Sequence, residues 1–164
     1  MTVPLPRTIV IGVGNEFRGD DGAGLAVARL LRAQLPPGIP VFEQSGEGTS
    51  LMDAWRNASH VLVIDAVHCG VSPGTIHRID ASTDRLPASL FPCSTHAFGV
   101  AEAIEMARAL HELPPTVVLY GIEAATFEDV QKLSAEVARA VSLVSAQISN
   151  EVAALLGPNH PSLR

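Results

Sequence analysis

Three stretches of this sequence, far apart from one another, carry residue types that bind divalent metal ions. The first is the adjacent pair Asp20 and Asp21, which lies in a glycine-rich stretch. The second is Asp65, which directly follows four consecutive apolar residues, and the third is His96. Carboxylate oxygens and a neutral imidazole nitrogen suit nickel or zinc and leave positions open for water or a substrate group. The residue types therefore indicate metal-assisted chemistry.

The same residues also allow structural interpretations. Either Asp20 or Asp21 can cap the helix that follows, and this task needs only one side chain, which leaves the other free to point into a cleft. Asp65 can bind backbone amides of the next loop. His96, however, is expected in the first turn of a helix, where the positive end of the helix dipole disfavours imidazolium. The ring should therefore be neutral and able to bind a metal, which favours the metal site.

Competing motifs are weaker. The glycine-rich stretch departs from the nucleotide pattern G-x-G-x-x-G at Phe17, and its paired carboxylates would repel phosphate. An alternative zinc site can be drawn from His68, Cys69, Cys93 and His96, although the two tight ligand pairs of a closed zinc site are missing. The pair His111-Glu112 begins like a zinc-protease helix, but Pro115 stands where the second histidine is needed. Surface or structural roles are assigned to His60, His77 and His160.

The spacing of apolar residues predicts which elements position these side chains. Short apolar or alternating runs predict strands at residues 8–12, 40–43, 61–64, 75–80 and 116–122. Amphipathic spacing predicts helices at residues 22–35, 50–57, 95–110 and 134–156. This alternation indicates an α/β fold: an open, mostly parallel twisted sheet of about five strands with helices on both faces. Ligands of such sheets bind at the carboxyl ends of the strands, where the candidate residues are expected.

Composition limits the class of protein. The chain has 164 residues, which suits a single domain over residues 1–164, with residues 1–6 and 158–164 expected to be flexible. A formal charge of −6 and eleven scattered Lys and Arg argue against a nucleic-acid partner. No apolar run approaches the roughly 20 residues that span a bilayer, and no secretory signal is recognisable. Two cysteines suggest free thiols, so a cytoplasmic location is expected.

Five short motifs follow one another along the chain. They are GVGN at 12–15, DDGxG at 20–24, IDAV at 64–67, PGT at 73–75 and HxxG at 96–99. In order and spacing the sequence resembles the nickel-iron hydrogenase maturation endopeptidases, and the resemblance covers nearly the whole chain. It implies that Asp21, Asp65 and His96 are the metal ligands and the catalytic residues.

The resemblance also implies a reaction and a partner. The expected activity is removal of a C-terminal extension from the nickel-loaded large-subunit precursor of a nickel-iron hydrogenase. Nickel would arrive in the substrate, and zinc or cadmium would be able to replace it. The nickel would either polarise the scissile carbonyl or serve only as a recognition tag, with the paired carboxylates activating water.

Two alternatives stay open. Many family members have Asp-Gly-Gly-Thr after the second strand, whereas this sequence has Glu47 within residues 44–49. Glu47 either replaces that carboxylate or marks a subgroup that serves another class of hydrogenase. The alternative function is a non-catalytic nickel-binding accessory protein that docks on the immature hydrogenase.

Overall fold

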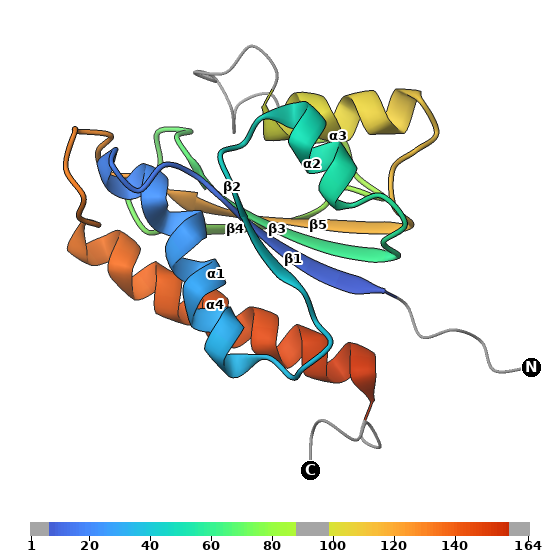
Figure 1. The fold of residues 1–164 in the computed structure, drawn as a ribbon. Coiled ribbons are helices and arrows are strands. Elements are labelled where there is room, and N and C mark those ends of the chain that lie inside the picture. The colour runs from blue at the N-terminus through green and yellow to red at the C-terminus, as the bar shows by residue number, and fades with distance from the viewer. Residues whose placement is uncertain (1–6, 88–98, 158–164) are drawn as a thin grey trace, which may run out of the picture.

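The fold is a five-stranded sheet between two layers of helices (Figure 1). The computed structural model describes residues 7–87 and 99–157. The strand order is β2-β1-β3-β5-β4, with β4 antiparallel to β5 and all other neighbours parallel. The strands are β1 (Thr8–Val13), β2 (Val41–Gln44), β3 (His60–Val67), β4 (Ile76–Asp80) and β5 (Thr116–Glu123). The predicted α/β sheet is confirmed; the predicted flexible termini lie outside the described residues.

The helices cover both faces of the sheet (Figure 1). The 3-10 turn η1 (Gly19–Gly22) precedes α1, and the α-helices are α1 (Ala23–Gln34), α2 (Gly48–Ala54), α3 (Val100–Ala109) and α4 (Ala135–Leu156). We call the two coverings the α1/α4 layer and the α2/α3 layer. Within the described residues, none of these helices combines the length and the apolar content needed to cross a membrane.

Alternate residues of the central strands supply two separate cores. On β3, Val61 and Val63 pack in the cluster that contains Leu51 of α2 and Ile104 of α3. Leu62 and Ile64 pack in the cluster that contains side chains of α1 and α4. Because successive side chains of a strand point to opposite faces, a strand that is apolar at every position belongs between two helical layers.

One glycine sets how closely α1 approaches the sheet. A Cβ atom on Gly24 would lie 2.3 Å from the carbonyl oxygen of Val13 and 2.4 Å from that of Ile64. Only glycine therefore fits between the ends of β1 and β3. This close approach brings η1 and the start of α1 against the end of β3, where Asp65 lies.

Two predicted boundaries were wrong in ways that concern the site. Asp65 lies within β3, not directly after it, because β3 pairs with β5 as far as Val67 and Glu123. The third helix begins at Val100, with Gly99 as its N-cap, and the backbone N–H of Gly99 donates a 3.1 Å hydrogen bond to the Glu102 carboxylate. The helix starts later than predicted because this hydrogen bond from Gly99 to the Glu102 carboxylate fixes its first turn.

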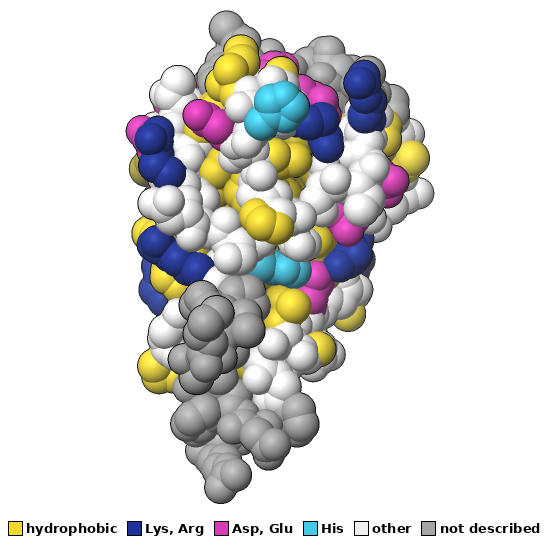
Figure 2. Space-filling view, turned by 90° about the vertical axis from the view of Figure 1, so that its right-hand side faces the viewer, with side chains coloured by type: hydrophobic (Ala, Val, Ile, Leu, Met, Phe, Trp, Pro, Cys, Tyr) yellow, Lys and Arg dark blue, Asp and Glu magenta, His cyan; other side chains and the backbone are white. Residues whose placement is uncertain are grey.

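The amino ends and the carboxyl ends of the parallel strands form two opposite edges of the sheet, and these edges carry different side chains. Figure 2 views the side on which the parallel strands begin, and there basic, acidic and apolar side chains are interspersed. Asp65 lies near the end of β3, and Asp21 lies in η1, beyond the end of β1. The predicted ligands described by the structure therefore belong to the carboxyl edge, as expected for a parallel α/β sheet.

Candidate functional site

The two neighbouring aspartates of η1 have different surroundings. Asp20 is completely buried, and its Oδ2 atom accepts hydrogen bonds from the backbone N–H groups of Ala125 (2.8 Å) and Thr126 (3.2 Å). Ser134 donates to the same carboxylate from its backbone N–H (2.7 Å) and its hydroxyl (2.9 Å). Asp20 therefore fastens η1 to the loop between β5 and α4. The alternative that it caps α1 is wrong, because no side chain caps that helix.

Asp21 lies close enough to Asp65 for their charges to interact. Burial of its carboxyl group raises the pKa of Asp65 well above the ordinary value, and the negative charge of Asp21 raises that pKa further. A hydrogen bond from the backbone N–H of Ala66 acts in the opposite direction and is a smaller effect. Both aspartates are only partly buried. The structure thus brings together two carboxylates that are 44 positions apart (65 − 21) in the sequence.

The third predicted ligand, His96, lies outside the described residues, as does Cys93 of the alternative zinc site. Helix α3 begins at Val100, so position 96 does not lie in its first turn, where the sequence had predicted it. The face of the sheet on which Asp65 lies can nevertheless be established. Asp65 follows Val61 and Val63 at two-residue spacing along β3, so its side chain lies on the same face of the sheet, which the α2/α3 layer covers.

Glu47, the residue that departs from the family pattern, caps a helix. Its carboxylate accepts hydrogen bonds from the backbone N–H groups of Thr49 and Ser50 at 3.0 and 2.9 Å. The hydroxyl groups of the same two residues donate to it at 2.6 and 2.9 Å. These bonds, with that from the Thr49 hydroxyl the strongest, lower the pKa of Glu47 to about 2. Its carboxylate is therefore engaged in holding the first turn of α2.

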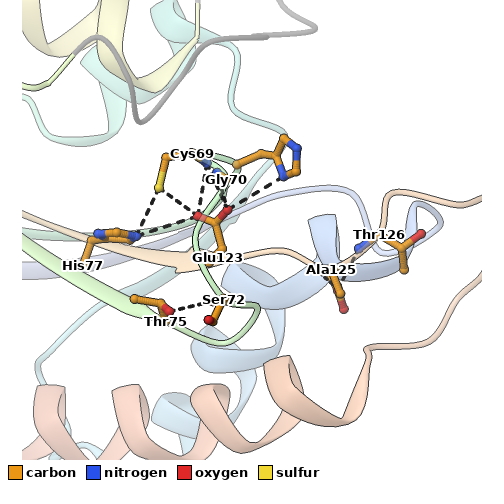
Figure 3. Close-up of polar contacts among 10 residues, drawn as sticks. Cys69, Gly70, Ser72, Thr75, His77, Glu123, Ala125 and Thr126 are labelled. Atoms are coloured by element: carbon orange, nitrogen blue, oxygen red, sulfur yellow. Dashed lines mark hydrogen bonds and ion pairs between the residues drawn. The ribbon is translucent and has the colours of Figure 1, made fainter.

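A second group of polar side chains lies further along the same edge (Figure 3). The buried carboxylate of Glu123 accepts hydrogen bonds from the backbone N–H groups of Cys69 (3.0 Å) and Gly70 (2.9 Å). The thiol of Cys69 donates to Glu123 Oε2 at 3.0 Å, and its sulfur lies 3.5 Å from His77 Nε2. We call Cys69, His77 and Glu123 the CHE cluster.

Charge explains the protonation states in the CHE cluster. Burial alone would raise the pKa of Glu123, but the hydrogen bonds from the Cys69 thiol and from the backbone N–H groups of Cys69 and Gly70 outweigh it and lower that pKa. The hydrogen bond to this carboxylate, together with burial, raises the pKa of the Cys69 thiol. Glu123 is therefore ionised while Cys69 keeps its proton. A thiol in this state is a poor nucleophile.

The CHE cluster was only partly predictable from the amino-acid sequence. His77 was assigned a surface or structural role, yet its side chain is 23% exposed and lies 3.8 Å from Glu123 Oε2. Its position follows from β4 pairing antiparallel to β5, where His77 is opposite Gly121. Glu123 was not among the predicted site residues. It lies at the carboxyl end of a buried strand, as Asp65 nearly does, and an acidic residue at that position could have indicated a site.

The sequence and fold both match known proteins. A family model described as HycI, hydrogenase maturation protease, matches residues 25–151. A relative from Methanocaldococcus jannaschii that carries a hydrogenase maturation protease name is 32% identical over 153 residues, which is 88% of this chain and 95% of that protein. The hydrogenase expression/formation protein HupD of Thiocapsa roseopersicina is 28% identical over 128 residues, which is 76% of this chain and 57% of HupD.

The solved structure of the hydrogenase maturating endopeptidase HybD from E. coli superimposes with a TM-score of 0.76 at 22% identity, over 89% of this chain and 91% of HybD. That likeness concerns the fold alone. Because the family model covers most of the chain, the chain belongs to the hydrogenase maturation protease family. It spans only 57% and 63% of the length of the HupD and HupM relatives.

Proposed function

We propose that this chain is an endopeptidase that removes a C-terminal extension from the nickel-loaded large-subunit precursor of a nickel-iron hydrogenase. Membership of the hydrogenase maturation protease family supports the class of reaction. The observation that carries the proposal is the Asp21 and Asp65 pair, two interacting carboxylates at the edge of the sheet where substrates of such folds bind.

The donor set fits a divalent cation. Burial first, and then the negative charge of Asp21, raise the pKa of Asp65, and a cation between the two carboxylates would offset their mutual repulsion. Asp21, Asp65 and His96 are the residues we assign to the substrate-borne nickel, with two oxygens and one nitrogen as ligand atoms. When bound, the nickel supplies a positive charge that can polarise a carbonyl group.

The residues of the chain then have two tasks. Asp21 and Asp65, by binding the metal of the precursor, place the peptide that is to be cut at the carboxyl edge of the sheet. Their second task belongs to the alternative route, in which the nickel is only a recognition tag: the raised pKa of Asp65 favours its protonated form as proton donor to the departing amine, while the Asp21 carboxylate accepts a proton from the attacking water. Acid catalysis of this kind needs two carboxyl groups with separated pKa values.

The decisive experiment measures the mass of the large subunit. Purified chain is incubated with nickel-loaded precursor and, separately, with precursor that lacks nickel, and the products are weighed by mass spectrometry. We expect a shortened large subunit only from the nickel-loaded precursor. Stable binding without shortening would instead identify the chain as the non-catalytic accessory protein.

Variants test the assigned residues. Asp21→Asn, Asp65→Asn and His96→Ala should each leave the chain folded and lower the cleavage rate roughly a hundredfold or more, the usual contribution of a positioned acid or base. Asp53→Asn, a change at a carboxylate whose side chain is 73% exposed, is the matched control and should cleave normally. Full processing by the first three variants would end the assignment. An Asn variant that binds nickel-loaded precursor normally but does not cut it would select the acid route.

A further inference from the structure

The CHE cluster has no part in the proposed cleavage, yet it contains three different metal-binding groups. Cys69 follows β3, His77 lies on β4 and Glu123 ends β5, and one ligand atom from each lies within 4.8 Å of the others. In Figure 3 the three side chains point toward one another. From these positions we infer a second, resident metal site, of the zinc class, formed by Cys69 Sγ, His77 Nε2 and Glu123 Oε2.

The distances between the ligand atoms fit a tetrahedral ion. With ordinary zinc–ligand bond lengths, the edges of a tetrahedral site measure roughly 3.3–3.6 Å. The sulfur of Cys69 lies 3.5 Å from His77 Nε2 and 3.0 Å from Glu123 Oε2. The third edge, between His77 Nε2 and Glu123 Oε2, is 3.8 Å. Shifts of a few tenths of an ångström would therefore bring all three edges to the expected values.

A fourth ligand is also within reach. His68 Nδ1 lies 3.8 Å from Glu123 Oε1, and the His68 side chain is 59% exposed, with an edge-to-face ring contact to Phe127. Either His68 or a water molecule can complete the tetrahedron. A thiolate, one or two imidazoles and a carboxylate are a mixed soft and borderline set, which selects zinc over calcium or magnesium.

Charge favours a metal over a catalytic cysteine here. Deprotonated Cys69 would place a second negative charge beside buried Glu123. A divalent ion balances both charges at once. On binding, the metal–sulfur bond replaces the S–H bond, the proton passes to solvent, and no electron is transferred.

The second site lies beside the Asp21 and Asp65 pair and uses different residues. Asp65 and Val67 are on the same face of β3, and Val67 is opposite Glu123 while Asp65 is opposite Gly121. Two residues along a strand correspond to about 6.5 Å. A metal in the CHE cluster would link the loop after β3 to β4 and β5, beside the residues assigned to the substrate-borne nickel.

Cobalt provides the test, because a cobalt–thiolate bond produces a near-ultraviolet charge-transfer band. The untagged full chain is freed of metal with a chelator and titrated with Co²⁺. We expect the band, tetrahedral visible absorption and one equivalent bound. Cys69→Ser should remove the band, and His77→Ala should raise the dissociation constant at least about a hundredfold. Cys93→Ser and Asp65→Asn are the matched controls and should keep the band.

Circular dichroism of the metal-free variants checks that each has folded, and His77→Gln replaces His77→Ala if the latter does not fold. A charge-transfer band that persists in Cys69→Ser, unchanged affinity in the His77 variant, or no band in the wild-type chain would overturn the inference. None of these outcomes affects the proposed cleavage, which is measured by the mass of the large subunit with Asp21 and Asp65 intact.

Discussion

Asp20 and Asp21 carry the same side chain at adjacent positions, but their tasks separate once their partners are known. Asp20 is enclosed and accepts four hydrogen bonds from the segment 125–134. Asp21 is partly exposed and interacts electrostatically with Asp65. The first aspartate fixes where η1 lies, and this in turn places the second at the edge of the sheet. Fixing of this kind lets a site bind its ligand without paying to order a loop.

Replacing Asp20 by Asn tests this anchoring role. The amide group would turn an N–H donor toward donors of the backbone, so at least one charge-assisted hydrogen bond is lost in a fully buried position. The free energy of unfolding should fall by about 3 kcal/mol, measured by urea denaturation. Asp53→Asn, at an exposed carboxylate, should change it by less than about 0.5 kcal/mol. Equal stability of the two variants would show that Asp20 anchors nothing.

Sequence reasoning reached the residues of the site unequally. The proximity of Asp21 and Asp65 was predictable because each lies in a stretch that follows a strand-like run, and the carboxyl ends of parallel strands meet at one edge. Which of Asp20 and Asp21 anchors η1 was not predictable from local spacing, since the choice depends on the distant loop 125–134. His77 was missed because its role requires the antiparallel register that places it opposite Gly121.

For the helices and strands, the type of each element was predicted better than the residues at which it begins and ends. Apolar runs gave the central strands correctly, but Asp65 and Ala66 extend β3 because β5 pairs with them. Helix α2 begins at Gly48, two residues before the predicted start at Ser50, since the Glu47 carboxylate caps its first turn. Local hydrophobic spacing does not contain these pairing and capping partners, so boundaries depend on contacts that only the fold creates.

One polar contact fastens β4, β5 and α4 together. The Tyr120 hydroxyl donates a 2.6 Å hydrogen bond to Glu151 Oε2 and accepts a 3.2 Å bond from Arg78 Nε. Arg78 also forms a 2.7 Å ion pair with Glu151. Burial of the ring, followed by the hydrogen bond to Glu151, raises the pKa of Tyr120 to about 12.

This pKa is directly measurable, because Tyr120 is the only tyrosine of the chain. Ultraviolet titration of the folded chain should give a midpoint near pH 12. Glu151→Gln should lower the pKa but leave it above the ordinary value of about 10, since burial remains. A folded pKa above the unfolded one contributes stability below pH 10 that is lost as the pH rises through 12. A midpoint near pH 10 in the folded wild-type chain would contradict the contact.

At the scale of the whole molecule, the sheet is shared by two cores that do not touch each other. Trp55, the only tryptophan, is buried on the side of the α2/α3 layer, and Tyr120 is buried on the side of the α1/α4 layer. Each of the central strands supplies side chains to both cores. Loss of one helical layer would expose the strand face that it covers, so the two layers should unfold together.

Tryptophan fluorescence and the tyrosine second-derivative spectrum should therefore give coincident urea unfolding curves, as a single domain requires. Ile104→Ala removes methyl groups from the Trp55 core and Ile148→Ala from the Tyr120 core, each costing about 3 kcal/mol. Each variant should shift both curves by the same amount, although each cavity lies on one side. If Ile148→Ala shifted only the tyrosine curve, the two helical layers would unfold as independent units. The sheet alone could then not hold its carboxyl edge rigid.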